Sequence, residues 1–140
     1  MNKARKIAIA GATGMVGQSF LKLLEKDYFQ DSEISLLASS NSAGKEINFR
    51  GKNHKVEDLS KFNFSEFDLA LFSAGSSVAS TYAPIAVSQG CVVVDNSSCF
   101  RYEDDIPLIV PEVNSKVLDD YEMYSQESII NPGRLTIDLT

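Results

Sequence analysis

The sequence predicts a single α/β domain built on a doubly wound, mostly parallel sheet. Short apolar runs recur along the 140 residues, a glycine-rich turn follows the first run, and helical patterns separate several of the others. A chain of this length buries roughly two thirds of the surface that its unfolded form exposes, so it can form a core without metals or disulfides. Cys91 and Cys99 have the spacing of neither a zinc nor a redox motif, which indicates a reduced, cytoplasmic chain.

Composition narrows the possible partners. Thirteen Lys and Arg against nineteen Asp and Glu leave a net charge of -6, the wrong sign for a protein that follows nucleic-acid phosphates. Apolar runs fall far short of the roughly 20 residues that a membrane helix needs. We therefore expect neither a nucleic-acid nor a membrane partner, and an anionic ligand would need a local site.

The beginning of the chain predicts a βαβ unit. Lys6–Ala10 is a short isoleucine-rich run typical of a strand buried on both faces, and Glu33–Ala38 is a second such run. Between them, apolar residues recur at the spacing of one helical face: Val16, Phe20, Leu23 and Leu24.

Three glycines join the first strand to this helix. Gly11, Gly14 and Gly17 have the spacing G-x-x-G-x-x-G. In such a turn one glycine permits the bend, one lets a pyrophosphate approach the backbone, and one lets the helix pack on the sheet. Amides at the helix start then favour an anion. The turn predicts a Rossmann-like dinucleotide site, with a purely structural turn as the alternative.

The end of the second strand bears on the choice of dinucleotide. Ser39, Ser40, Asn41 and Ser42 follow it, with no carboxylate to repel a 2'-phosphate and several hydroxyls to bind one. NADP is therefore favoured over NAD, and a polar turn without a ligand is the alternative. Residues 44–59 then alternate around Ile47 and Phe49, which predicts a small hairpin decorating the sheet edge. We expect His54 to be a solvated surface residue without a metal.

Residues 68–73 predict a third buried strand, which ends in a loop of small residues. Ser77 or Ser80 can cap the next helix, whose apolar face would consist of Val78, Tyr82, Ile85 and Ala86. Because proline belongs in a first turn, Pro84 predicts that this helix starts near Tyr82 or is kinked.

Residues 91–95 predict a fourth strand, followed by a polar cluster at the ligand edge of the sheet. In that cluster Arg101 can clamp a phosphate or carboxylate, or can instead pair with Glu103 or Asp104. No histidine lies near Cys99 in sequence, so we do not expect it to be an activated nucleophile. Cys91 lies in an apolar run and is predicted to be a small core residue. Two further strands are expected at 107–110 and 128–131, with a helix capped by Asn114 between them.

Several motifs resemble aspartate-semialdehyde dehydrogenases, in the family's order: GATGMVG, LASSNSAGK, ALFSAGSSV, YAPIAV, VVVDNSSCFR and PLIVPEVN. The resemblance covers residues 6–132 and only the family's amino-terminal, dinucleotide-binding part. It implies NADP-dependent reductive dephosphorylation of aspartyl phosphate to aspartate semialdehyde, in lysine, methionine and threonine biosynthesis. It also implies a homodimer for the complete enzyme.

The resemblance assigns roles by position. The residues facing the pyrophosphate would be Gly11, Thr13, Gly14, Met15 and Val16. Ser39 and Ser42 would approach the 2'-phosphate. The residues on the diphosphate and nicotinamide side would be Ser73, Ala74, Gly75, Ser76 and Asn96. Arg101 would bind the phosphate of the acyl phosphate.

The chain departs from the family in two places. Asn41 stands where many relatives have arginine, which weakens strict NADP preference. The family's nucleophile lies in N-P-N-C-[ST]-T, whereas here Asn131 and Pro132 are followed by divergent residues, with Arg134 at the cysteine position. We therefore expect a cofactor domain over 1–132, a divergent tail over 133–140, and no catalytic or dimerisation domain. Such a chain would lack catalytic residues and activity alone.

Two alternatives remain open. N-acetylglutamyl-phosphate reductase shares the general plan, although the SAGSS and DNSSCFR segments argue against it. A non-catalytic NADP-binding sensor or scaffold on the same fold is the other.

Overall fold

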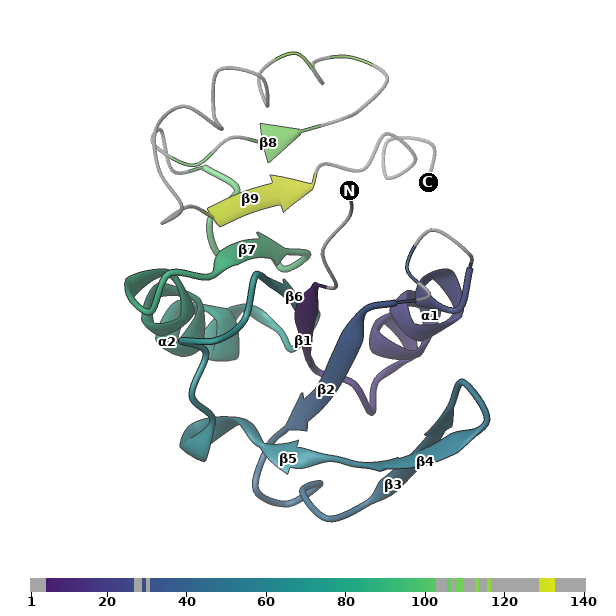
Figure 1. Cartoon of the computed structure of the whole chain (residues 1–140). Coiled ribbons are helices and arrows are strands. Elements are labelled where there is room, and N and C mark those ends of the chain that lie inside the picture. Colours follow the sequence, from purple (N-terminus) through teal and green to yellow (C-terminus); the bar gives the residue numbers. More distant parts are fainter. Residues whose placement is uncertain are drawn as a thin grey trace.

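The computed structural model describes residues 5–26, 29, 31–102, 106, 108–109, 113, 116 and 129–132. Within these residues, a seven-stranded sheet has the order β5-β2-β1-β6-β7-β9-β8, and its paired strands run parallel. Its strands are β1 (Lys6–Ala10), β2 (Glu33–Ala38), β5 (Glu57–Asp58), β6 (Leu69–Phe72), β7 (Val92–Asp95), β8 (Leu108–Ile109) and β9 (Ile129–Pro132). The chain moves outward from β1 through β2 to β5, then crosses back to β6 on the other side of β1 (Figure 1). This confirms the doubly wound α/β, Rossmann-like fold.

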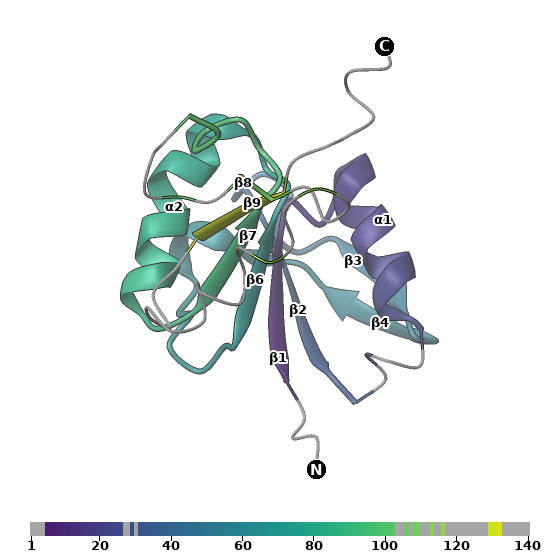
Figure 2. The same ribbon diagram turned by 90° about the horizontal axis from the view of Figure 1, so that it is seen from above.

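Helices α1 (Met15–Leu24) and α2 (Ser76–Ser88) cover opposite faces of the sheet (Figure 2). Strand β1 divides the core by alternation: Ile7 and Ile9 join the cluster on the α1 side, whereas Ala8 and Ala10 join the cluster on the α2 side. The α2 face meets these small residues with its own alanines, so the helix can pack closely on the sheet.

The buried face of α1 agrees with the prediction in Leu24, which is buried, and in Phe20, which packs half-buried against the core, but differs at other positions. Gly17, Leu21 and Leu24 are buried, whereas Leu23 is 52% exposed and Val16 is 40% exposed. The close approach of Gly17 to the glycine turn sets the rotation of the helix, and residues at i+4 and i+7 from it then point inward. Hydrophobic spacing alone could not reveal that a glycine lies at the centre of the buried face.

A start of α2 near Tyr82 and a cap by Ser77 or Ser80 are wrong, whereas the alternative of a kink at Pro84 stays a prediction. The helix begins at Ser76 with Gly75 as its N-cap at φ +89°, and neither Ser77 nor Ser80 caps it. Pro84 lies inside the helix on its exposed side, while the buried face consists of Ala79, Ala83 and Ala86. Solvent can reach the carbonyl whose amide donor the proline removes, so the helix continues through it.

The hairpin is confirmed as β3 (Glu46–Phe49) and β4 (Lys52–Lys55), but it is more than an edge decoration. Phe49 is buried against the α1 face, and the chain then returns beside β2 as β5 (Figure 1). His54 is half-buried rather than solvated: its Nε2 lies 3.1 Å from the carbonyl oxygen of Phe49, and the two rings meet edge to face.

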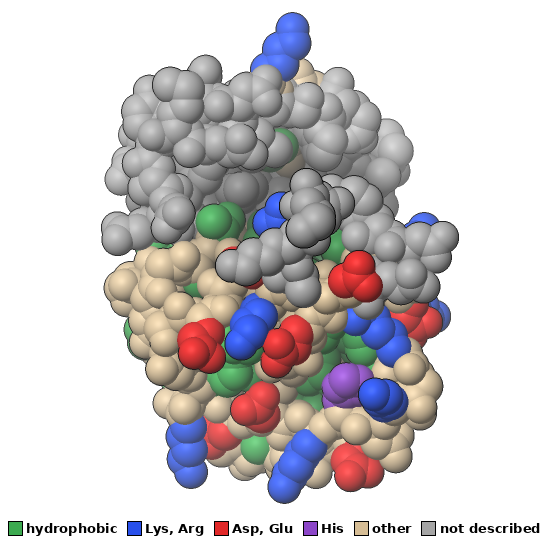
Figure 3. All heavy atoms as spheres, in the orientation of Figure 1, with side chains coloured by type: hydrophobic (Ala, Val, Ile, Leu, Met, Phe, Trp, Pro, Cys, Tyr) green, Lys and Arg blue, Asp and Glu red, His purple; other side chains and the backbone are tan. Residues whose placement is uncertain are grey.

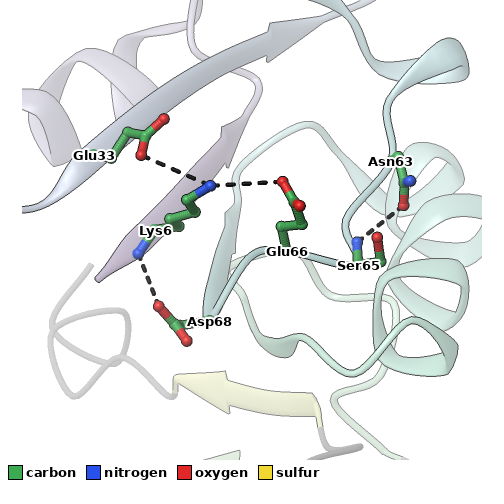
Figure 4. Close-up of polar contacts among 6 residues, drawn as sticks. All are labelled: Lys6, Glu33, Asn63, Ser65, Glu66 and Asp68. Carbon is green, nitrogen blue, oxygen red and sulfur yellow. Dashed lines mark hydrogen bonds and ion pairs between the residues drawn. The ribbon is translucent and has the colours of Figure 1, made fainter. Parts of the chain in front are cut away.

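At the amino ends of the strands, Lys6 of β1 contacts β2 and the loop that precedes β6. Its Nζ lies 3.9 Å from a carboxylate oxygen of Glu33 and 3.6 Å from one of Glu66. Its backbone N–H donates to Asp68 Oδ2 at 2.8 Å (Figure 4). On the face shown in Figure 3, acidic and basic side chains of the described residues are likewise interspersed.

The later strands follow the prediction, with β8 inside 107–110 and β9 overlapping 128–131. The helix expected after Asn114 lies outside the described residues. Among the described helices, none is long and apolar enough to cross a membrane.

Candidate nucleotide site

A cavity of about 480 Å³ lies at the carboxyl ends of β1, β2 and β6. This is where the chain switches from one side of β1 to the other, the usual ligand position in open α/β sheets. Its lining consists of Gly11, Thr13, Gly14, Ala38, Ser39, Ser40, Asp58, Leu59, Ser60, Ser73, Ala74, Val78 and Tyr82.

Gly11 and Gly17 have the two structural roles that the glycine spacing predicts, a tight turn and close packing of the helix. Gly11 has φ +88°, and a Cβ there would come within 2.7 Å of the carbonyl oxygen of Ser73. A Cβ on Gly17 would overlap the carbonyl oxygen of Gly11, so this glycine brings α1 against the turn. Gly14 is exposed at the cavity, and a Cβ there would meet nothing closer than 3.5 Å. The backbone at Gly14 is therefore open to a ligand.

Both helices present uncompensated N-termini at this edge of the sheet. The N-cap of α1 is Gly14 and that of α2 is Gly75, and neither helix has a side-chain cap or an acidic residue in its first turn. First-turn amides without helical partners and the positive end of the dipole together favour an anion. The arrangement fits the diphosphate of a dinucleotide.

The opposite end of the cavity includes a group that sequence reasoning missed. Ala38 on β2 pairs with Asp58 on β5, so Asp58, Leu59 and Ser60 lie beside Ser39 and Ser40. The residues that follow β2 contain no carboxylate, as expected, but the neighbouring strand β5 supplies one at the same place. Val56 and Leu59, two buried apolar residues flanking the pair Glu57 and Asp58, were the available signal for a returning strand.

Asp58 is held in place by its own loop. Its Oδ1 accepts hydrogen bonds from the N–H of Ser60 at 2.9 Å and from Ser60 Oγ at 2.7 Å. These bonds stabilise the charged form and lower the pKa of Asp58 below its ordinary value, with a smaller contribution from Lys61. A fixed negative charge therefore lines the cavity.

The predicted pyrophosphate and ribose residues are divided between the cavity and its rim. Gly11, Thr13, Gly14, Ser39, Ser73 and Ala74 line it. The side chains of Met15 and Val16 point to solvent, being 89% and 40% exposed, so only their backbone can serve a ligand in this arrangement. Ser42 lies outside the lining and donates its N–H to the carbonyl of Ser39 at 2.9 Å.

Apart from Ser73 and Ala74, the residues predicted for the nicotinamide and substrate side lie outside the cavity lining. Gly75 and Ser76 start α2, and Ser76 Oγ lies 3.0 Å from Ser98 Oγ in the loop after β7. In that loop, Asn96 donates its N–H to the carbonyl of Phe72 and Arg101 donates its N–H to that of Ser98. Glu103 and Asp104, the alternative partners of Arg101, lie outside the described residues.

Asp95 shapes this loop from inside the protein. It is completely buried, and its carboxylate accepts from the N–H of Ser97 at 3.0 Å and from Ser97 Oγ at 2.7 Å. Ser97 Oγ in turn accepts from the N–H of Cys99 at 3.2 Å. Asp95 thus supports the loop that carries Asn96 and Arg101.

Cys91 is the core residue that the sequence predicts. Burial, with a contribution from the charge of Asp68, raises the pKa of its thiol to about 12. In the part of the chain that the structure describes, no three His, Cys, Asp or Glu side chains are grouped to hold a metal ion.

The fold, the glycine turn and the cavity together define a dinucleotide-binding α/β domain. Residues 6–121 match the family "Semialdehyde dehydrogenase, NAD binding domain", and the chain belongs to this family. The aspartate-semialdehyde dehydrogenase of Legionella pneumophila is 51% identical over 139 residues, which are 99% of this chain and 40% of that protein. The chain therefore spans about two fifths of the length of this relative.

Solved structures agree. Aspartate semialdehyde dehydrogenase II of Vibrio cholerae complexed with ASA superposes with a TM-score of 0.85 at 42% identity, covering 94% of this chain and 38% of that one. The Candida albicans enzyme with NADP has a TM-score of 0.79 at 31% identity, covering 92% and 42%.

Proposed function

We propose that this chain is the NADP-binding portion of an aspartate-semialdehyde dehydrogenase. The observation that carries the proposal is the cavity at the switch point, where the glycine turn and the uncapped start of α1 meet in a chain of this family. The family is the NAD-binding domain of semialdehyde dehydrogenases, and NADP is present in the related Candida albicans structure.

In this proposal the backbone amides of Thr13, Met15 and Val16 hold the diphosphate. Gly11 and Gly14, whose own N–H groups donate to the carbonyls of Leu37 and Gly11, line the approach without side chains. The adenosine ribose lies toward Ser39, with Ser42 at the rim. Ser73, Ala74, Gly75, Ser76 and Asn96 then approach the nicotinamide half. The bound cofactor supplies or accepts the hydride, and these residues orient it at the carboxyl edge of the sheet.

Arg101 is proposed to bind the phosphate of aspartyl phosphate in the complete enzyme. Its planar guanidinium suits phosphate, and the loop that carries it is supported by the buried Asp95. The reaction's acyl transfer needs a thiolate, yet Arg134 stands where the family motif has cysteine. We therefore expect no oxidation of aspartate semialdehyde by this chain alone, and a homodimer is proposed only for the complete enzyme.

Calorimetric titration of the chain with NADP and with NAD tests the binding proposal. Saturable binding of NADP, weakened by Gly14→Ala, supports it, because a methyl group at Gly14 would occupy the diphosphate approach. Absence of binding of both nucleotides at millimolar concentration would refute it. Measurable, thiol-sensitive turnover of aspartate semialdehyde by the chain would refute the expectation drawn from Arg134.

A further inference from the structure

We propose that Asp58 is a specificity-determining residue of the cavity, whose carboxylate disfavours a 2'-phosphate on the adenosine ribose. The inference rests on the proposed nucleotide site and concerns which dinucleotide that site accepts. Because of Asp58, the chain discriminates between NADP and NAD less strongly than its serines alone would.

The position of Asp58 follows from strand register. In doubly wound folds the diphosphate sits at the first glycine turn and the ribose hydroxyls reach the carboxyl end of the second strand. Here that end is Ala38, whose partner in the neighbouring parallel strand is Asp58. Adjacent strands lie about 4.8 Å apart, so β5 supplies a carboxylate beside Ser39 and Ser40 that the carboxyl end of β2 lacks.

The carboxylate is also oriented. Both hydrogen bonds from Ser60 go to Oδ1, and among the described residues Oδ2 accepts no hydrogen bond. Oδ2 can therefore accept from a ribose hydroxyl, as the acidic residue at the end of the second strand does in NAD-binding folds. A 2'-phosphate at the same place would put two anions together, partly offset by Lys61.

The serines act in the opposite direction. Ser39 and Ser40 are exposed hydroxyl groups at the same end of the cavity, and they can donate to a phosphate. Their attraction and the repulsion by Asp58 act on the same ribose position. We therefore expect the chain to bind both dinucleotides.

The test compares Asp58→Asn with the parent chain and with Glu57→Gln. Asparagine keeps an acceptor for Ser60 but removes the charge. Glu57 is an exposed carboxylate on the same strand that does not line this cavity, so its variant controls for net charge. Dissociation constants are measured by calorimetry for NADP and NAD, and for 2',5'-ADP and 5'-AMP, which isolate the adenosine half.

In Asp58→Asn, we expect the affinity ratio of NADP to NAD to rise by about 3- to 10-fold at low ionic strength and by less at high salt. The ratio of 2',5'-ADP to 5'-AMP should rise in parallel. Glu57→Gln should leave both ratios within about twofold, because its charge lies outside the cavity lining. Asp58→Ser, which also keeps a capping acceptor, should shift them in the same direction as Asp58→Asn.

The outcomes separate this inference from the proposed function. If the folded parent binds nucleotides but Asp58→Asn and Asp58→Ser change the ratios no more than Glu57→Gln does, the role of Asp58 is overturned and the nucleotide site stands. If the parent binds none of the four probes, the proposed function itself fails.

Discussion

The carbonyl oxygen of Gly11 occupies the space that a Cβ on Gly17 would need. The turn before α1 and the first buried residue of the helix are thus in direct backbone contact. This contact, rather than the spacing of the larger apolar residues, sets which face of α1 packs on the sheet. It also brings the start of the helix to the cavity.

Replacing Gly17 with alanine should therefore be costly. The added methyl group would also come within 2.9 Å of the Ala12 Cα, so backbone must move, and we expect a loss of about 2 to 4 kcal/mol in the free energy of unfolding. Urea denaturation followed by circular dichroism measures it. Gly14→Ala is the matched control, with an expected loss below about 1 kcal/mol from its N-cap position. Equal losses of unfolding free energy in the two variants would show that the close Gly11–Gly17 contact does not demand glycine at position 17.

Arg50 joins the hairpin to the end of α1. Its guanidinium donates to the carbonyl of Ser32 at 2.6 Å, to that of Leu24 at 2.9 Å and to that of Phe29, and it lies over the Phe49 ring. The residue has φ +56°, a left-handed conformation that asparagine tolerates. Arg50→Asn keeps that backbone and removes the three bonds.

We expect Arg50→Asn to lower the free energy of unfolding by about 2 to 3 kcal/mol, because several carbonyls lose a charged donor together. Lys52→Asn, an exposed change in the same hairpin, should stay within about 0.5 kcal/mol. Thermal and urea denaturation would both report the difference. If Arg50→Asn lowers the free energy of unfolding as little as Lys52→Asn does, water hydrogen-bonds these carbonyls as well as Arg50 does.

Asp95 is the polar side chain in the described residues that is wholly buried. Asp95→Ala would remove the carboxylate that accepts from the N–H and hydroxyl of Ser97 and would open a cavity, so we expect a loss of about 2 to 4 kcal/mol in the free energy of unfolding. Ser97→Ala keeps the backbone bond to Asp95 and should cost about half as much. Comparable stability of Asp95→Ala and the parent chain in urea would contradict this role.

The strands of the sheet and the glycine turn could be predicted because they depend on local patterns. Apolar runs such as Lys6–Ala10 and the spacing of Gly11, Gly14 and Gly17 carry their own signal. Asp58 could not be placed at the cavity in the same way. Its position depends on the hairpin returning the chain beside β2, a pairing between residues that are distant in sequence.

The two helices show a second limit. Hydrophobic spacing assigned Leu23 and Ile85 to buried faces, yet both are exposed, because small residues lie at the centre of each helix–sheet contact. A hydrophobic pattern is read from large apolar side chains. Close packing of the helices on the sheet instead requires glycine in α1 and alanine in α2.

Cys91 gives a pH-dependent prediction whose sign follows from its burial. Burial first, and the charge of Asp68 second, raise the pKa of its thiol from 9.0 to about 12 in the folded chain. At pH values below the unfolded pKa, both states hold the proton and the contribution to stability is fully present. Above it, the unfolded chain loses the proton more readily, so stability falls as pH rises toward the folded pKa.

Between pH 8 and pH 10, Cys91 should therefore lower the free energy of unfolding of the parent chain by about 1 to 2 kcal/mol. Other groups titrate over the same range, so the measurement is the difference between the parent and Cys91→Ala in urea at each pH. Cys99→Ala, which removes the half-buried cysteine, is the matched control for the loss of a thiol. If Cys91→Ala loses stability with pH as steeply as the parent does, the buried thiol is not the group responsible.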